Sequence, residues 1–145
     1  MHRTWIVVAD SARARIFERD GRWQPLAELQ GLAHPESRLH HGDLKTGGRG
    51  EQQESTGRAS HASDWSTTPS QQEAKRFARE VADTLHEGRT QNRFERLVLV
   101  AAPAFLGRLR DKLDGPTRHC VTQTLDKNWA RHATPEIQGL LEQHF

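Results

Sequence analysis

The stretch Leu97–Pro103 reads LVLVAAP, a short unbroken apolar run that follows the polar Arg96 and ends at a proline. A run that is short, partly β-branched and free of polar alternation is typical of a strand covered on both faces, as parallel strands are in α/β proteins. We therefore expect this stretch to be the central strand of a sheet. A second continuous run, Trp5–Ala9, is expected to lie beside it.

Residues 12–18 predict a second, half-exposed strand after a turn at Asp10 and Ser11. The stretch reads ARARIFE. Successive side chains of a strand point to opposite faces, so Ala12, Ala14 and Ile16 are expected on one face and Arg13, Arg15 and Phe17 on the other.

A third strand is expected over residues 23–29. Asp20 and Gly21 are a hairpin signal, because both residue types tolerate positive φ. Pro25 cannot donate to a strand ladder, so this strand is expected at an edge or beside a bulge. The first 30 residues therefore predict an antiparallel meander.

Residues 31–69 form a segment of a different character. It holds few large apolar side chains, many Gly, Ser, Thr and His, and no periodicity. Loops longer than about 15 residues are uncommon in compact domains and are usually functional or disordered. We therefore expect one domain, residues 1–145, with a long flexible loop at about 31–69.

A helix is expected to begin near Pro69, which suits a first helical position, and Ser70 with Glu73 matches a capping box. Ala74, Phe77, Ala78, Val81, Ala82 and Leu85 form its apolar stripe. Gly88 is expected to end it.

The remaining elements follow from similar signals. Residues 103–113 predict a helix stopped by DGP at 114–116, residues 118–125 a fifth strand, and TPE at 134–136 the start of a last helix. The order β-β-β-α-β-α-β-α predicts an α/β fold of three layers with a mixed five-stranded sheet, which is a ribonuclease-H-like layout.

Charge and composition limit the classes of function. The net charge of +2 divides as +1 for residues 1–30, −1 for 31–69 and +2 for 70–145. Binding of nucleic acid would therefore need a local basic patch. The single cysteine, Cys120, excludes an internal disulfide and is expected to be a buried strand residue. No apolar run approaches the ~18 residues of a membrane span, so we expect a cytoplasmic protein without a membrane partner.

Neither a metal site nor a cofactor is expected. Four of the nine histidines, His34, His40, His41 and His61, fall in the long loop, but their spacing does not match that of metal ligands. A ribonuclease-H-type catalytic site would need several carboxylates on the central strands to hold two metals, and only Asp10 stands there. A lone strand-end aspartate is more often part of a turn. The layout therefore favours binding over catalysis.

The segment Lys45–Gln53 reads KTGGRGEQQ. It resembles a phosphate-binding loop only superficially, because the pattern G-x-x-x-x-G-K-[ST] is absent. Its glycines give the backbone many accessible conformations and little bulk. Such a segment fits closely against another backbone or a nucleic acid, or it is a linker, and composition alone favours the linker.

Three blocks carry a resemblance to a known family. Residues 3–17 (RTWIVVADSARARIF), 73–80 (EAKRFARE) and 96–107 (RLVLVAAPAFLG) resemble the bacterial host attachment protein family, whose members are described as required for attachment to host cells. That family is similar to the middle domain of archaeal and eukaryotic class-1 peptide release factors, which has the same order of elements and a long loop before its first long helix. In those factors the loop carries Gly-Gly-Gln, a tripeptide that this sequence lacks.

The resemblance implies a non-catalytic binding module with the ribosome or tRNA as partner. Two alternatives stay open: hydrolysis of peptidyl-tRNA or another ester through the loop glutamines, and a protein-interaction adaptor behind the attachment phenotype. The sequence leaves the oligomeric state open. The candidate binding residues are Arg13, Arg15, Lys45, Gly47, Gly48, Arg49, Gly50, Gln52 and Gln53.

Overall fold

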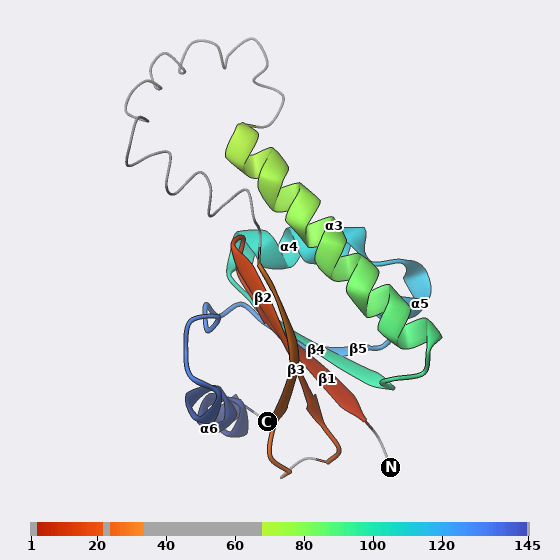
Figure 1. Ribbon diagram of the computed structural model, residues 1–145, viewed down its shortest axis with the longest axis vertical. Helices are drawn as coiled ribbons and strands as arrows, with labels where there is room; N and C mark the ends of the chain where they lie inside the picture. The colour runs from red at the N-terminus through yellow and green to blue at the C-terminus, as the bar shows by residue number, and fades with distance from the viewer. Residues whose placement is uncertain (1–2, 22–23, 34–67, 145) are drawn as a thin grey trace.

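The computed structural model describes residues 3–21, 24–33 and 68–144 of the 145-residue chain. Figure 1 shows the strands and helices of this part. In chain order they are β1 (Thr4–Ala9), β2 (Arg13–Arg19), β3 (Ala27–Ala33), α3 (Pro69–Thr90), β4 (Arg96–Ala101), α4 (Pro103–Lys112), α5 (Gly115–His119), β5 (Val121–Leu125) and α6 (Thr134–His144).

The five strands form one mixed sheet in the order β3-β2-β1-β4-β5. β1 is antiparallel to β2 and parallel to β4, with Ile6 opposite Val98, and β4 is parallel to β5. The predicted mixed five-stranded sheet with a ribonuclease-H-like layout is therefore confirmed. The Leu97 run was expected to be the central strand. The central strand is β1 instead, and the Leu97 run forms its neighbour β4. Both runs are continuously apolar because β1 and β4 are each buried on both faces.

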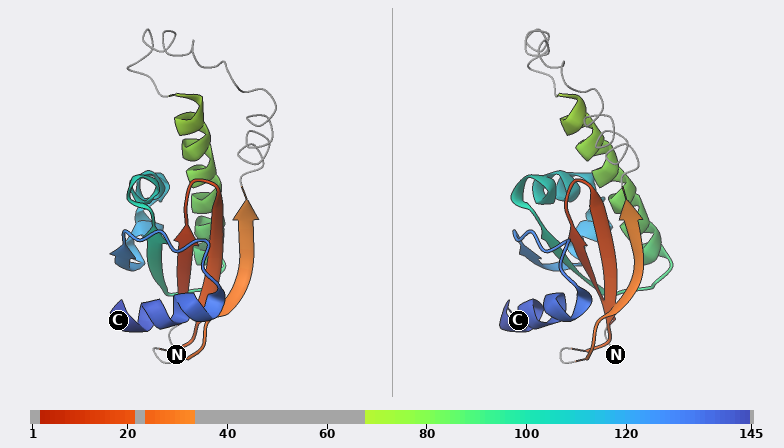
Figure 2. Two further views of the ribbon diagram at one scale, coloured as in Figure 1. Left: turned by 90° about the vertical axis from the view of Figure 1, so that its left-hand side faces the viewer. Right: turned by 60° about the vertical axis from the view of Figure 1, so that its left-hand side comes forward.

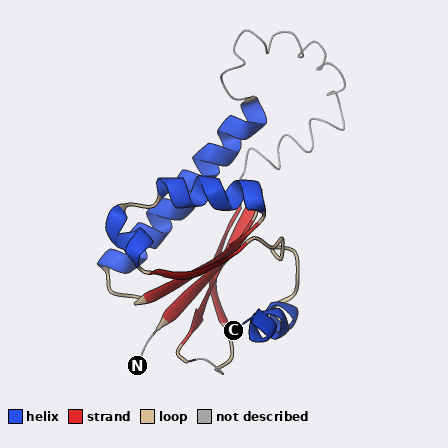
Figure 3. Ribbon diagram, turned by 180° about the vertical axis from the view of Figure 1, so that it is seen from behind, coloured by secondary structure: helices blue, strands red, loops and turns tan. Residues whose placement is uncertain are grey.

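Two hydrophobic cores, one on each face, hold the sheet between its helices. Alternate residues of β1 supply both cores: Trp5, Val7 and Ala9 pack with α3 and α4, whereas Ile6 and Val8 pack with α6. Figures 2 and 3 show the resulting layers, with α3, α4 and α5 on one side of the sheet and α6 on the other. No helix in the described part is long and apolar enough to cross a bilayer.

Helix α3 begins at Pro69 as expected, but its cap lies two residues earlier than predicted. The Thr68 hydroxyl accepts the Gln71 N–H at 3.1 Å, and the Gln71 side chain accepts the Thr68 N–H at 3.1 Å. The box predicted at Ser70 and Glu73 is wrong, because proline occupies the first helical position and leaves the preceding residue as the cap.

The prediction that Gly88 ends α3 is also wrong. The helix continues to Thr90 and closes at Asn92, whose φ of 58° lies in the left-handed region. The Arg93 N–H donates to the Gly88 carbonyl at 2.8 Å, and the Asn92 N–H donates to the Arg89 carbonyl at 2.9 Å. This is a Schellman motif with asparagine in place of the usual glycine.

Strand β3 covers residues 27–33, so the prediction of residues 23–29 is wrong by four positions. Its last residue, Ala33, pairs with Arg13 of β2, and therefore residues 31–33 belong to the sheet and not to the expected loop. The predicted edge position is confirmed, and the β2–β3 register shifts between Ile16 and Phe17. Gly21 does not adopt a positive φ, contrary to the hairpin prediction. Residues 34–67 of the expected loop lie outside the described residues.

The fifth strand is shorter than predicted because residues 115–119 form the short helix α5. The Asp114 side chain accepts the Thr117 N–H at 2.8 Å, so the expected stop signal is in fact a helix cap. Cys120, expected in a strand, follows α5 at its carboxyl end and is half-buried against the α3-side core.

We expect Asp114→Ala to lower the free energy of unfolding by about 1 kcal/mol, the usual cost of losing such a cap. Hydrogen bonds from Thr117 hold the pKa of Asp114 below its usual value. The lost stability should therefore be largest near neutral pH and should disappear as the pH falls through the lowered pKa. Urea unfolding at pH 7 and near pH 2 measures it. Asp111→Ala, an exposed change on α4, is the control, and equal midpoints for the two variants would contradict the cap.

Candidate functional site

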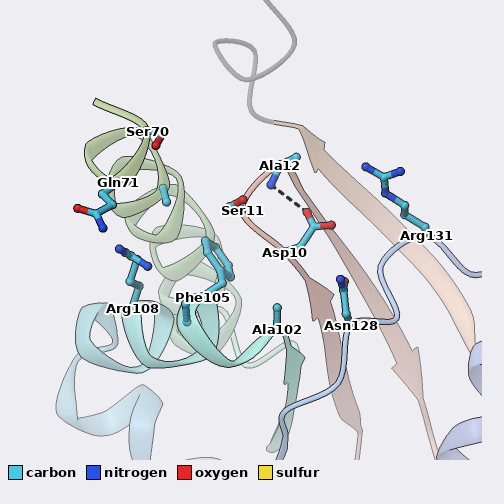
Figure 4. A pocket seen from close by; sticks show the side chains of 12 residues that line it. Asp10, Ser11, Ala12, Ser70, Gln71, Ala102, Phe105, Arg108, Asn128 and Arg131 are labelled. Atoms are coloured by element: carbon cyan, nitrogen blue, oxygen red, sulfur yellow. Dashed lines mark hydrogen bonds between the residues drawn. The ribbon is translucent and has the colours of Figure 1, made fainter. Parts of the chain in front are cut away.

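The parallel strands β1 and β4 end side by side at Ala9 and Ala101, and a cavity of about 410 Å³ lies at this edge of the sheet. We call it the edge pocket. Its walls come from four separate stretches: the β1–β2 turn, the start of α3, the start of α4 and the connection after β5. Figure 4 shows the lining residues, which are Asp10, Ser11, Ala12, Ser70, Gln71, Ala74, Ala102, Ala104, Phe105, Arg108, Asn128 and Arg131.

Asp10 fixes the β1–β2 turn, which forms one wall of the edge pocket. Its Oδ1 accepts the N–H groups of Ala12 at 2.8 Å and Arg13 at 2.9 Å, and its own N–H donates to the Arg13 carbonyl at 2.9 Å. The turn role expected for this aspartate is confirmed. Asp10 is the only acid among the lining residues, and within residues 3–21, 24–33 and 68–144 no three His, Cys, Asp or Glu side chains gather as metal ligands would.

Helix α4 begins at the edge pocket without a side-chain cap. Ala102 occupies the cap position and offers no acceptor, and Pro103 follows it. The first-turn N–H groups of a helix have no partner inside the helix and carry its positive dipole end. Arg108 lies on the next turn, and its Nε is buried without a hydrogen-bond partner among the described atoms. This side of the edge pocket therefore carries the amino-terminal end of a helix and an arginine.

The opposite side of the edge pocket carries Arg131 and Asn128, both exposed, from the connection between β5 and α6. Figure 4 shows them across the pocket from Arg108 and Gln71, with Asp10 between the two sides. Two arginines against one carboxylate leave a positive lining. Guanidinium and backbone N–H donors suit an anionic oxygen ligand such as phosphate.

A second depression of about 160 Å³ lies between α3 and α4, and we call it the basic groove. Its lining residues are Gln72, Lys75, Arg76, Arg79 and Lys112, four cations and no acid. Lys75 and Arg79 stand four positions apart on α3, as Arg108 and Lys112 do on α4, so each pair shares a helix face. The basic groove and the edge pocket therefore both lie between α3 and α4 but share no lining residue.

The residues proposed from the sequence lie elsewhere. Arg15 is engaged inside the molecule: it pairs with Glu28 at 3.0 Å and donates to the backbone carbonyls of Ala130 and His132. Arg13 precedes it by two residues on β2, and its Nε is buried without a partner among the described atoms. Neither lines the edge pocket or the basic groove. Lys45, Gly47, Gly48, Arg49, Gly50, Gln52 and Gln53 lie outside the described residues.

Sequence reasoning missed the cations of α3 and α4. Their signal was available, because Lys75 and Arg79, and Arg108 and Lys112, repeat at helical spacing beside the apolar stripes. What the sequence did not show is that α3 and α4 pack against each other, which brings the two rows together. No local sequence pattern indicated a role for Arg131. It lines the edge pocket because the chain after β5 runs back to this edge of the sheet.

Both the sequence and the structure of the chain are similar to those of known proteins. A family model described as "Protein required for attachment to host cells" matches residues 5–141. No curated protein matches the chain significantly. Among solved structures, the chain is similar to the Aquifex aeolicus Ppx/GppA phosphatase in its type II variant, with 14% identity and a TM-score of 0.40. That match covers 86% of this chain and 36% of the phosphatase chain, and at this similarity it says nothing of function.

Proposed function

This chain belongs to the family of proteins required for attachment to host cells, and we propose that within it the chain is a non-catalytic module that binds RNA, with tRNA or the ribosome as its partner. The resemblance to release-factor middle domains suggested this partner. The basic groove is the observation that carries the proposal.

The basic groove supplies the local patch that the nearly neutral net charge of +2 required. Four cations from two helices line it without an acid among them. Exposed charges separated by more than about 8 Å are largely screened at physiological salt, so a phosphate held there responds to these cations more than to the protein's net charge. Lysine and arginine held on a rigid helix pair provide contacts to the nucleic-acid backbone that do not depend on sequence.

The turn at Asp10 supports a binding role over a catalytic one. The one lining carboxylate of the edge pocket already accepts two backbone N–H groups, so part of its capacity to bind a metal is used in shaping the turn. The hydrolase alternative depends on Gln52 and Gln53, which lie outside the described residues. Release of the peptide from peptidyl-tRNA by the intact chain, lost in a Gln52→Ala and Gln53→Ala double variant, would replace our proposal with that alternative.

We expect the double variant Lys75→Gln and Arg79→Gln to bind tRNA about tenfold more weakly than the parent at 0.1 M salt. Each lost phosphate contact should also reduce the slope of log affinity against log salt by about one. Fluorescence anisotropy with labelled tRNA over a salt series measures both quantities. Co-sedimentation with ribosomes tests the second partner.

The matched control removes two cations that line neither the basic groove nor the edge pocket. Arg96→Gln with Arg110→Gln changes the net charge equally at exposed positions of β4 and α4. This variant should keep the parental salt slope. An equal loss in both variants would mean that net charge alone binds RNA, and unchanged binding in the groove variant would remove the groove from the interface.

A further inference from the structure

The surface around the basic groove lacks the aromatic side chains on which nucleic-acid bases stack. Proteins that hold single strands stack successive bases on such side chains. The tryptophans and phenylalanines of the described part of the chain are at most 6% exposed: Trp5, Phe17, Phe77, Phe94, Phe105 and Trp129. The sequence contains no tyrosine, and none of the described residues that line the basic groove is aromatic. The described surface therefore offers a single strand no stacking platform of Trp, Phe or Tyr.

The basic groove is also too small to enclose a base that is turned out of a strand. Its volume is about 160 Å³, whereas pockets that enclose small organic ligands begin at about 300 Å³. Single-stranded RNA is read through splayed bases that are stacked and hydrogen-bonded on their edges. The lining of four cations and the amide of Gln72 instead suits phosphate and hydroxyl oxygens.

Helices α3 and α4 hold these cations in a fixed arrangement. The buried rings of Phe77 and Phe105 pack α3 against α4, with ring centroids 5.8 Å apart. The first turn of α3, residues 69–72, is exposed and extends beyond the ends of the strands (Figures 1 and 2). A rigid partner meets such a surface without the ordering cost that a flexible single strand pays on binding. The geometry therefore favours a partner whose phosphates are already held in place.

We propose that the basic groove binds the backbone of a base-paired RNA stem and not a single strand. This inference rests on the proposed function and names the form of RNA that the same groove holds. A-form RNA displays 2′-hydroxyls and phosphates across a wide, shallow minor groove. Lys75, Arg79 and Lys112 supply donors for the phosphates, and Gln72 supplies a donor and an acceptor for a hydroxyl. Backbone contacts carry no sequence information, so binding should depend on the shape of the stem and not on its base order.

Fluorescence anisotropy of the intact chain with labelled RNA tests the inference. The first probe is a hairpin stem of about 16 base pairs, which is the span of a typical module for double-stranded RNA. The second probe is a single strand with the same number of nucleotides and no self-complementarity. We expect the stem to bind about tenfold more tightly than the single strand at 0.1 M salt. Two stems of unrelated sequence should bind within about twofold of each other.

Lys112→Gln should weaken binding of the stem about threefold and reduce the slope of log affinity against log salt by about one. Arg110→Gln is the matched control. It removes the same charge from the same helix, but Arg110 does not line the basic groove, and the variant should bind the stem as the parent does. Circular dichroism establishes that each variant is folded.

The outcomes separate this inference from the proposed function. A single strand that binds as tightly as the stem overturns the inference, whereas tRNA binding by the same protein would still support the proposed function. Binding of the stem without binding of tRNA or ribosomes supports the inference and overturns the proposed partners. Absence of binding to any RNA overturns both. Equal losses in Lys112→Gln and Arg110→Gln overturn the assignment to the basic groove, since they would show a contribution of charge without position.

Discussion

Gly88→Ala is expected to destabilise the fold by about 2 kcal/mol, although alanine is the better helix former. A Cβ at position 88 would lie 2.7 Å from Cη2 and Cζ3 of Trp5 and 3.2 Å from Cε2 of Phe94. Overpacking of this kind costs about 1–3 kcal/mol. The helical preference of alanine over glycine returns only about 0.5–1 kcal/mol. Thermal and urea unfolding of the two proteins measures the difference.

The indole ring of Trp5 cannot easily move away from a new methyl group. Trp5 is fully buried, its Nε1 donates to Glu18 at 3.2 Å, and its ring packs against Phe94 with centroids 4.8 Å apart. The guanidinium of Arg93, a residue at the surface, lies 5.1 Å from the ring centroid. Because the ring is held on several sides, the strain from a methyl group at position 88 would spread to the hydrophobic core between the sheet and α3.

Gly107→Ala is the matched control for Gly88→Ala, because it makes the same substitution in helix α4. A Cβ at Gly107 would meet no atom within 4 Å. This variant should therefore gain about 0.5–1 kcal/mol of stability from helix propensity alone. We expect Gly88→Ala to lower the free energy of unfolding and Gly107→Ala to raise it. A stabilised Gly88→Ala protein would show that the contact with Trp5 is loose and would refute the packing account.

The layers of this fold were predictable from sequence because two continuous apolar runs, of five and seven residues, restrict the possible arrangements. A strand that is apolar at every position must be buried on both faces. Helices α3 and α4 bury one face of β1 and β4, and α6 buries the other. The predicted stripe of α3, from Ala74 to Leu85, is buried as expected. Periodicity therefore identified the elements and the faces that they bury.

The boundaries were less predictable because they depend on contacts between distant residues. Gly88 carries the usual signal for a helix end, yet it is glycine because Trp5, 83 positions earlier, packs against it. Asp114, Gly115 and Pro116 signal a turn and a helix start equally well. Only the cap hydrogen bond to Thr117 shows that a helix follows.

The candidate site was the least predictable part. The edge pocket joins segments that are distant in sequence, such as Asp10 and Arg131, and no local pattern links them. The rule that parallel strands end at a common edge would have selected Asp10 and Ala102 as neighbours. It would not have selected Arg131, because the path of the chain after β5 has no periodic signal.

The contacts of Arg15 were also not predictable from its local sequence. Exposure was expected from its alternation with apolar residues, yet its side chain is only 18% exposed. Its Nη1 donates to two carbonyls in the connection that leads into α6, and its Nε and Nη2 hold both oxygens of Glu28. One side chain therefore joins β2 and β3 to the last quarter of the chain.

Arg15→Gln is expected to lower the free energy of unfolding by about 2–3 kcal/mol. Glutamine is too short to keep the paired contact with Glu28, and the carbonyls of Ala130 and His132 lose a charged donor. Half-buried acceptors left without a partner cost about 1–3 kcal/mol. Urea unfolding at pH 6 measures the loss, and Arg96→Gln at an exposed position of β4 should cost less than about 0.5 kcal/mol.

The pH dependence of stability distinguishes the Arg15–Glu28 ion pair from a general effect of charge. The hydrogen bond from Arg15 and its positive charge hold the pKa of Glu28 below its usual value of 4.5, burial opposes them, and Thr134 adds a weaker hydrogen bond. A carboxyl whose pKa is lowered by folding stabilises the protein above the unfolded-state pKa. That contribution is lost as the pH falls through the folded-state pKa. The coupling between Arg15→Gln and Glu28→Gln in a double-mutant cycle should therefore be clear at pH 6 and absent near pH 2. Absence of coupling at pH 6 would mean that Arg15 acts through its backbone contacts alone, and the ion pair would then have no part in holding β3 to the sheet.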